Sequence, residues 1–173
     1  KAMFQFRAQD FLAWNDSIFS DQDWENLTSI ASGGKRNEEG KIGTWGTGFL
    51  SVFHLTDIPE VNSAGEKLIL DPREEFADVT SSNIKDGTGF RMEWRRKPSD
   101  ISREIDADIW SDENIQVLKD SLAVSIYRQI IFLRNVNCIE VYEGDRWQEK
   151  LLYRVARTRK SMVQQSGYRC ELW

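Results

Sequence analysis

Gly43-Thr44-Trp45-Gly46-Thr47-Gly48-Phe49 decides the expected fold, because its three glycines stand at the first, fourth and sixth places. The apolar side chains of Phe49, Val52 and Phe53 then follow at helical spacing. Glycine accepts positive φ and lets a ligand approach the backbone closely. A helix start presents unpaired N–H groups that favour phosphate. The stretch therefore indicates a phosphate-binding loop, although an ordinary surface turn fits the same residues, and it is neither a Walker loop nor a dinucleotide fingerprint.

The composition is typical of a globular domain with a substantial core. The chain has 173 residues, of which 40% are hydrophobic, and it contains seven tryptophans. The formal net charge of −5 disfavours bulk binding to nucleic acid or to an anionic membrane. No apolar run approaches the ~20 residues that a membrane span needs. We therefore expect no membrane segment and no nucleic-acid partner.

Two cysteines, Cys138 and Cys170, are too few and too far apart for a zinc cluster. They could pair, but a reducing compartment explains them more simply, so we expect a cytoplasmic protein without a structural metal. The start at Lys1 has no signal-peptide core and no initiator methionine, so we expect a fragment or a processed chain.

Apolar periodicity and turn residues predict a mixed order of helices and strands. Ser20, with Asp23 three residues later, is a good helix N-cap, and Ser111 caps a second, longer helix. A third helix is expected from the glycine-rich stretch to about Leu55. We expect strands over 3–7, 11–14, 60–62, 67–70, 88–95, 137–142, 147–157 and 167–173, and an irregular loop over 71–86. The fold class predicted is α/β, an α+β two-layer sandwich whose mixed, mostly antiparallel sheet has helices packed on one face.

Four features occur in one order: Asn15-Asp16 after a strand, Ser32-Gly33-Gly34-Lys35, the glycine-rich stretch, and Gly87-Thr88 at a strand start. This order resembles the GHKL or Bergerat ATP-binding fold of Hsp-ninety chaperones, gyrase B, MutL and histidine kinases. The sacsin-type branch is the most similar, and the likeness covers about residues 1–95. It rests on Phe19-Ser20-Asp21-Gln22-Asp23-Trp24, on the run from Ile42 to Pro59, on Leu70-Asp71-Pro72 and on Gly87-Thr88-Gly89-Phe90-Arg91.

The resemblance implies that Asp16 accepts a hydrogen bond from the adenine amino group, which guanine does not present at that position. Thr88 would support this contact, directly or through water. A turn-capping aspartate and an ordinary β-branched strand residue are the alternative interpretations of the two positions.

The resemblance also implies contacts with the phosphates of the nucleotide. Backbone amides of the glycine-rich stretch would close on them, and Lys35 would reach them from a lid over residues 32–41, unless it is simply a solvated loop lysine. We expect this lid to be mobile, the alternative being a surface loop indifferent to nucleotide. The implied phosphate-binding residues are Lys35, Gly43, Gly46, Thr47, Gly48 and Phe49.

His54 is the single histidine, and the two basic runs at 95–97 and 157–160 could contact nucleic acid. For His54 we favour a structural packing position over a catalytic one. For the basic runs, solvated strand ends fit equally well, and the acidic total favours that interpretation.

In the family, a helix before the first hairpin carries the carboxylate that activates water and an asparagine that binds Mg²⁺. Lys1-Ala2 would be the tail of that helix, so its catalytic turn is absent here, and a partner segment would replace the helix unless an apolar face is exposed. We expect residues 1–173 to form a single ATP-binding domain of a larger chaperone-like or regulatory ATPase. The catalytic residues are unknown, and Mg²⁺ would act only in the intact protein.

The expected partners are ATP or ADP, other domains of the parent protein and a second copy in a homodimer. The alternative is a nucleotide-free scaffold or protein-interaction module that retains the fold. A kinase of the histidine-kinase branch is disfavoured by the chaperone-like glycine pattern.

Overall fold

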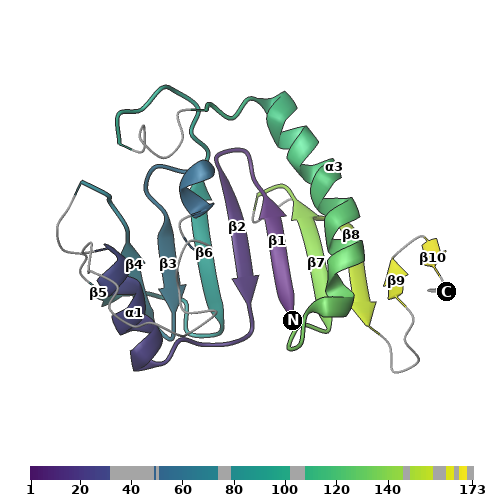
Figure 1. Ribbon diagram of the computed structural model, residues 1–173, viewed down its shortest axis with the longest axis horizontal. Helices are drawn as coiled ribbons and strands as arrows, with labels where there is room; N and C mark the ends of the chain where they lie inside the picture. Colours follow the sequence, from purple (N-terminus) through teal and green to yellow (C-terminus); the bar gives the residue numbers. More distant parts are fainter. Residues whose placement is uncertain are drawn as a thin grey trace, which may run out of the picture. The chain divides into compact units, whose positions relative to one another are not determined.

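The computed structural model describes residues 1–31, 49, 51–73, 79–101, 108–145, 149–157, 163–165 and 168–170 (Figure 1). The chain forms two compact units. The split unit consists of Lys1–Asp16 and Trp110–Trp173, and the inner unit consists of Ser17–Ile109. The single domain expected over residues 1–173 stays a prediction.

The split unit is built on a sheet with the strand order β2-β1-β7-β8-β9-β10. The pair β1–β7 is parallel, whereas the other described pairs of this unit are antiparallel. Hairpin pairing sets Phe6 opposite Phe11, with ring centres 4.8 Å apart. The strands are β1 (Ala2–Phe6), β2 (Asp10–Asn15), β7 (Cys138–Glu143), β8 (Lys150–Arg157), β9 (Val163–Gln165) and β10 (Tyr168–Cys170).

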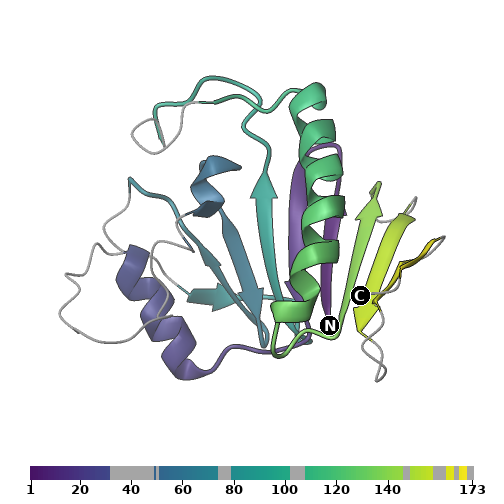
Figure 2. The same ribbon diagram turned by 45° about the vertical axis from the view of Figure 1, so that its right-hand side comes forward.

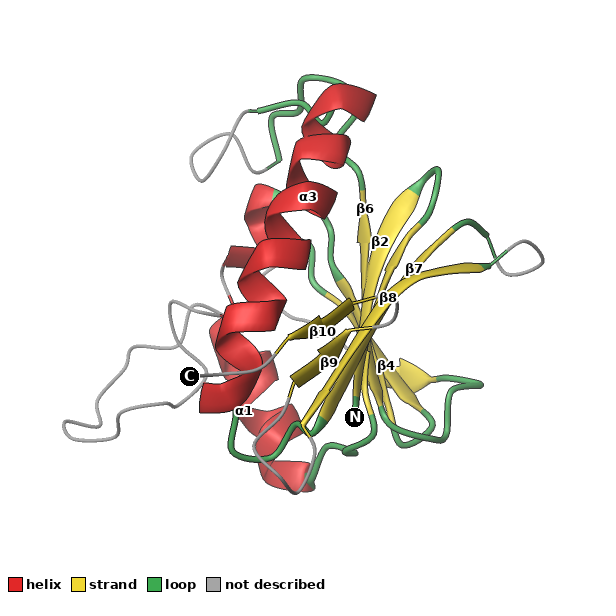
Figure 3. Cartoon of the chain, turned by 90° about the vertical axis from the view of Figure 1, so that its right-hand side faces the viewer, coloured by secondary structure: helices red, strands yellow, loops and turns green. Residues whose placement is uncertain are grey.

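Helix α3 (Asp112–Gln129), continued by the 3-10 turn η2 (Ile130–Phe132), lies along one face of these strands (Figure 3). It begins where the Ser111 side chain accepts a hydrogen bond from the Asn114 amide at 3.1 Å. This is the N-cap that the sequence predicts. Lys119 forms an ion pair with Glu143 of β7 and lies 5.7 Å from the ring centre of Phe6. The buried residues of the unit include Ile115, Ile126 and Ile130 of the helical segment and Ile139, Val141 and Val155 of the strands.

The inner unit pairs four antiparallel strands in the order β6-β3-β4-β5. The β3–β4 hairpin turns at Ala64 and Gly65, whose φ angles of 53° and 85° are those of a two-residue hairpin turn. The short 3-10 helix η1 (Ser51–His54) leads into β3 (Figure 2). The strands are β3 (Glu60–Ser63), β4 (Glu66–Ile69), β5 (Val79–Ser81) and β6 (Thr88–Glu93).

Helix α1 (Asp21–Ala31) covers the apolar side of this unit. Ser20 and Asp23 form the expected capping box: the Ser20 amide donates to the Asp23 carboxylate at 2.9 Å, and the Asp23 amide donates to Ser20 Oγ at 3.3 Å. The buried cluster joins the helix, the glycine-rich stretch, η1 and the strands. It consists of Trp24, Leu27, Phe49, Phe53, Val61, Leu68 and Leu70.

The predicted fold class is confirmed, since helices layer onto mostly antiparallel strands with one parallel pair among those described. Two local expectations differ from the structure. The helix expected up to Leu55 is, beyond residue 50, a single 3-10 turn that ends at His54. Within the expected loop 71–86, Val79–Ser81 pairs with β4 as an exposed three-residue strand. All three of its residues are exposed, so no apolar alternation marked it as a strand.

Candidate functional site

Thr88 is the first residue of β6 and is 1% exposed. Its hydroxyl donates to the backbone carbonyl of Ser17 at 2.8 Å, and its oxygen lies 2.7 Å from Ser63 Oγ. Because the only hydroxyl proton of Thr88 goes to that carbonyl, Ser63 is the donor in the second contact. Ser63 Oγ in turn accepts from the Phe19 amide at 2.8 Å. Two side chains from neighbouring strands therefore hold the backbone at Ser17 and Phe19, directly after Asp16.

Asp16 follows β2, and its side chain is 57% exposed. The carboxylate accepts a hydrogen bond from the α-amino group of Lys1 at 2.7 Å, and this bond lowers the pKa of Asp16. An exposed, ionised carboxylate is a hydrogen-bond acceptor only, which is the state required to accept from an amino group.

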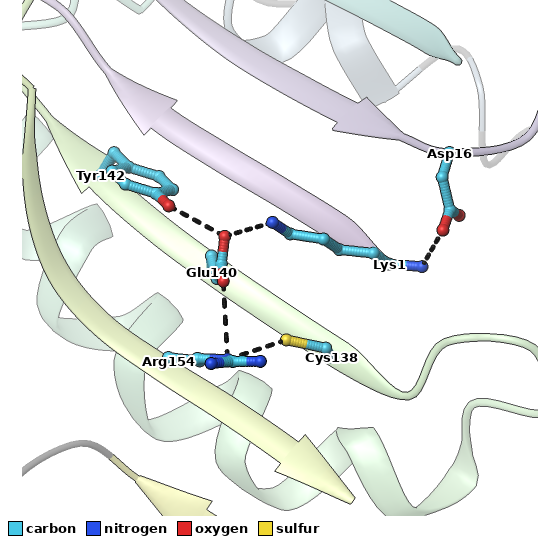
Figure 4. A network of polar contacts seen from close by, with 6 residues as sticks. All are labelled: Lys1, Asp16, Cys138, Glu140, Tyr142 and Arg154. Carbon is cyan, nitrogen blue, oxygen red and sulfur yellow. Dashed lines mark hydrogen bonds and ion pairs between the residues drawn. The ribbon is translucent and has the colours of Figure 1, made fainter. Parts of the chain in front are cut away.

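The Lys1 side chain belongs to a polar network of the split unit (Figure 4). Its Nζ lies 2.6 Å from Glu140 Oε2, and the Tyr142 hydroxyl donates to the same carboxylate at 2.8 Å. Arg154 Nε lies 3.5 Å from the other oxygen of Glu140 and donates to Cys138 Sγ at 3.3 Å. Burial alone would raise the pKa of Glu140, but the hydrogen bonds from Lys1 and Tyr142 outweigh it and lower that pKa. The network neutralises a buried carboxylate.

Phe49, the last residue of the glycine-rich stretch, is buried in the inner unit with 8% of its surface exposed. Its ring centre lies 6.1 Å from that of Phe90, which is 6.3 Å from Phe19. Phe19 packs edge-on against Trp24 at 5.1 Å. An aromatic cluster therefore holds the end of the glycine-rich stretch, and the contacts that the structure shows for Phe49 are packing contacts.

Arg95 is buried, with 3% of its surface exposed, and all three nitrogens of its guanidinium donate hydrogen bonds. Nε donates to Asp57 Oδ1 at 2.7 Å, and Nη1 donates to the Asp108 carbonyl at 3.1 Å. Nη2 donates to the carbonyls of Phe53 and Thr56. Arg95 therefore caps the end of η1, and the solvated strand end expected at this position is wrong.

Other predicted residues are placed differently or not described. His54 is exposed at the end of η1, so its expected packing position is wrong. Arg157 donates through Nη2 to the Arg134 and Val136 carbonyls, both at 3.2 Å, and to Asn137 Oδ1 at 2.9 Å. Lys35, Gly43, Gly46, Thr47 and Gly48, together with the expected lid 32–41 and the basic residues 158–160, lie outside the described residues.

Sequence reasoning missed the partners that make these positions specific. Neither Ser63 nor Arg95 is part of a local motif. Strand pairing brings Ser63 beside Thr88, and the folded chain brings Arg95 against the end of η1. In the described part of the chain, no three His, Cys, Asp or Glu side chains gather as a group able to hold a metal ion. The described helices also include none with the length and hydropathy that crossing a membrane requires.

Two sequence comparisons relate the chain to sacsin. Residues 1–86 match the sequence profile of the sacsin domain. Human sacsin is 25% identical over 193 aligned positions, which cover 90% of this chain and 4% of that protein. The chain is similar to sacsin. The chain thus spans only a small part of its curated sacsin relative.

Among solved structures, the N-terminal domain of a DNA repair protein matches with 9% identity and a TM-score of 0.44. The match covers 88% of this chain and 47% of that one. A likeness at this level carries no argument about function.

Proposed function

We propose that this sacsin-like chain is an ATP-binding domain of the GHKL type within a larger chaperone-like or regulatory ATPase. The observation that carries the proposal is the Thr88–Ser17 hydrogen bond, which fixes the backbone next to Asp16. Asp16 and Ser17 lie within residues 1–86, which match the sacsin domain, and Thr88 follows that segment. A carboxylate reads an adenine amino group only if the backbone that carries it is held in place.

The proposed roles follow from what each group can do. Asp16 is exposed and ionised, so it can accept from the amino group of adenine. Thr88 is 1% exposed and supports the contact indirectly, through the Ser17 carbonyl. Phe49 anchors the glycine-rich stretch, whose backbone amides are proposed to bind the phosphates. We attribute ATP hydrolysis, with Mg²⁺, to an intact protein that also carries the family's glutamate and asparagine.

Calorimetry of the 173-residue chain with ATP, ADP and GTP tests the proposal. We expect ATP and ADP to bind and GTP to bind more weakly, because guanine presents a carbonyl where adenine presents its amino group. Equal affinity for all three nucleotides would contradict the adenine assignment. Absence of binding to any of them would contradict the ATP-binding function.

A second candidate function, a nucleotide-free protein-interaction module, is favoured by one surface feature. The outer side of α3 and η2 carries exposed apolar side chains, whereas the exposed face of a helix usually carries polar ones. Val117 is 60% exposed, Val124 is 54% exposed and Phe132 is 79% exposed. Val117, Val124 and Ile131 recur every seven residues, so they form one stripe along the helical segment.

Analytical ultracentrifugation of the parent chain and of a Val124→Asp variant tests this candidate. A homodimer through the α3 stripe predicts concentration-dependent association of the parent and a monomeric variant, because an unpaired charge at an apolar interface is costly. Gln129→Glu, which adds the same charge at an exposed position five residues after Val124 and therefore on another side of the helix, is the matched control. A parent that stays monomeric at all concentrations would exclude the homodimer.

A further inference from the structure

Helix α3 has two sides that differ in burial. Ile115 and Ile126 are buried on the side that faces the strands of the split unit (Figure 3). The opposite side carries the stripe of Val117, Val124 and Ile131, which are 60%, 54% and 41% exposed. Residues seven positions apart on a helix lie within about 20° of one another, so the three side chains point in nearly the same direction. The stripe is therefore one continuous apolar strip.

The exposed charges of α3 are separated by sign along the helix. Its first turn is acidic and its last turn is basic, through Asp112 and Glu113 at the start and Arg128 at the end. Asp120 adds a further exposed carboxylate before the middle of the stripe. Lys119, the other charged residue of the helix, forms an ion pair with a residue of β7 and so belongs to the strand side. The surface around the stripe is thus acidic before Val124 and basic after it.

A second copy of this helix complements the first when it runs in the opposite direction. With the two Val124 side chains at the centre, residues at equal distances before and after Val124 lie at the same height. Val117 then lies level with the partner's Ile131, and Asp120 lies level with the partner's Arg128, once on each side of the two-fold axis. A parallel pair would instead bring Asp120 level with the partner's Asp120, and Arg128 level with the partner's Arg128. Like charges and parallel helix dipoles both disfavour that arrangement.

We propose that the outer side of α3 binds a second copy of this chain in an antiparallel, two-fold symmetric arrangement centred on Val124. The inference rests on the homodimer candidate described above. It adds the direction of the partner helix and the charged pair, Asp120 with the partner's Arg128, that selects this direction. The helix has 18 residues and is about 27 Å long, so the interface is small and the dimer forms at high protein concentration.

The test exchanges the two charges and measures association by sedimentation velocity over a range of concentrations. Asp120→Arg and Arg128→Asp each set like charges against one another twice in an antiparallel dimer. We expect each variant alone to dimerise about tenfold more weakly than the parent. An equimolar mixture of the two variants should associate within about threefold of the parent, because every arginine then lies level with an aspartate. Glu25→Arg, the same charge reversal at an exposed position of α1, is the control and should associate like the parent.

The outcomes separate this inference from the homodimer candidate. A parent that stays monomeric overturns the homodimer and the inference with it. A parent that dimerises, with single variants that dimerise equally well, overturns only the antiparallel arrangement. Single variants that are weakened but gain nothing from being mixed also overturn it, because the loss then does not come from this charged pair.

Disulfide trapping gives the direction independently, and it applies if a charge variant does not fold. Val117→Cys and Ile131→Cys are oxidised separately and as an equimolar mixture, with the parent as the control for its own two cysteines. We expect a cross-linked dimer above the parent level only in the mixture, because the antiparallel pair sets residue 117 of one copy beside residue 131 of the other. Cross-linking of Val117→Cys alone would show a parallel pair and overturn the inference. A mixture that cross-links no more than the parent would overturn it as well.

Discussion

Thr88 Oγ1 donates a 2.8 Å hydrogen bond to the carbonyl of Ser17, a residue 71 positions earlier in the chain. Both groups are in the inner unit, and Ser63 adds the second contact to the Thr88 oxygen at 2.7 Å. The link ties the chain leaving Asp16 to the start of β6.

Thr88→Val should destabilise the protein by about 1–3 kcal/mol, because it removes the donor to the Ser17 carbonyl and a partner of the buried Ser63 hydroxyl while keeping the side-chain shape. Chemical denaturation followed by tryptophan fluorescence measures this loss. Thr80→Val is the matched control, since Thr80 is exposed on β5 and its hydroxyl bonds to the Lys67 carbonyl only at 3.4 Å. Equal stability of the Thr88→Val variant and the parent would contradict an energetic role for this hydrogen bond.

Asp16→Asn should weaken adenine nucleotide binding by about 1–3 kcal/mol if a bound base buries the carboxylate, whose side chain is 57% exposed in the free chain. The amide has one acceptor oxygen where the carboxylate has two, and its NH₂ group repels the amino group of adenine. Calorimetry with ATP gives the difference. Asp21→Asn, at an exposed position in the first turn of α1, serves as the control. A variant that binds as tightly as the parent would assign Asp16 to turn formation.

Tyr153→Phe should remove a pH dependence of stability between about pH 10 and about pH 12. Burial raises the pKa of Tyr153 to about 12, and the charge of Asp120 adds to the shift. Above pH 10 the unfolded chain loses the phenol proton first, so stability falls as the pH rises towards 12. The phenol oxygen has no hydrogen-bond partner in the part of the chain that the structure describes.

Denaturation of the parent and of Tyr153→Phe at pH 8, 10 and 11.5 measures this effect. The parent should lose on the order of 1–2 kcal/mol more than the variant across this range. At pH 8 the variant should be as stable as the parent or more so, because it buries no unpaired hydroxyl. If the stability of both proteins fell equally with rising pH, the pKa of Tyr153 would be the same in the folded and the unfolded chain, which would contradict the prediction.

Glu140→Gln should make the protein less sensitive to acid. The pKa of Glu140 is lowered in the folded protein, so its contribution is fully present above its ordinary value of 4.5 and is lost as the pH falls through the folded pKa. Thermal unfolding from pH 7 to pH 3 should therefore show a smaller loss of Tm for the variant than for the parent. Glu25→Gln, on the exposed side of α1, is the control and should follow the parent. A Glu140→Gln curve parallel to that of the parent would contradict the proposed coupling to Lys1 and Tyr142.

The sequence by itself determined most of the local elements and the starts of the two long helices. The side chains of Ser20 and Ser111 each accept a hydrogen bond from an amide three residues later in the chain. The starts of α1 and α3 could therefore be predicted from the sequence. Ala64-Gly65 determined the β3–β4 turn, because glycine adopts the positive φ that the turn requires. The resemblance of residues 1–95 to the sacsin branch was readable in the same way, and the match of residues 1–86 to the sacsin domain agrees with it.

Only the tertiary structure decided which distant groups meet. Strand pairing sets Ser63 beside Thr88, and no pattern within either strand encodes that partner. The same holds for Arg95, which sequence alone placed in a solvated basic run and which folding buries against Asp57 and the end of η1. Lys1 and Glu140 meet because β1 pairs in parallel with β7, which lies more than 130 residues later in the chain. Local propensity acts over a few residues, whereas the burial of polar groups makes their partners obligatory only after the strands have assembled.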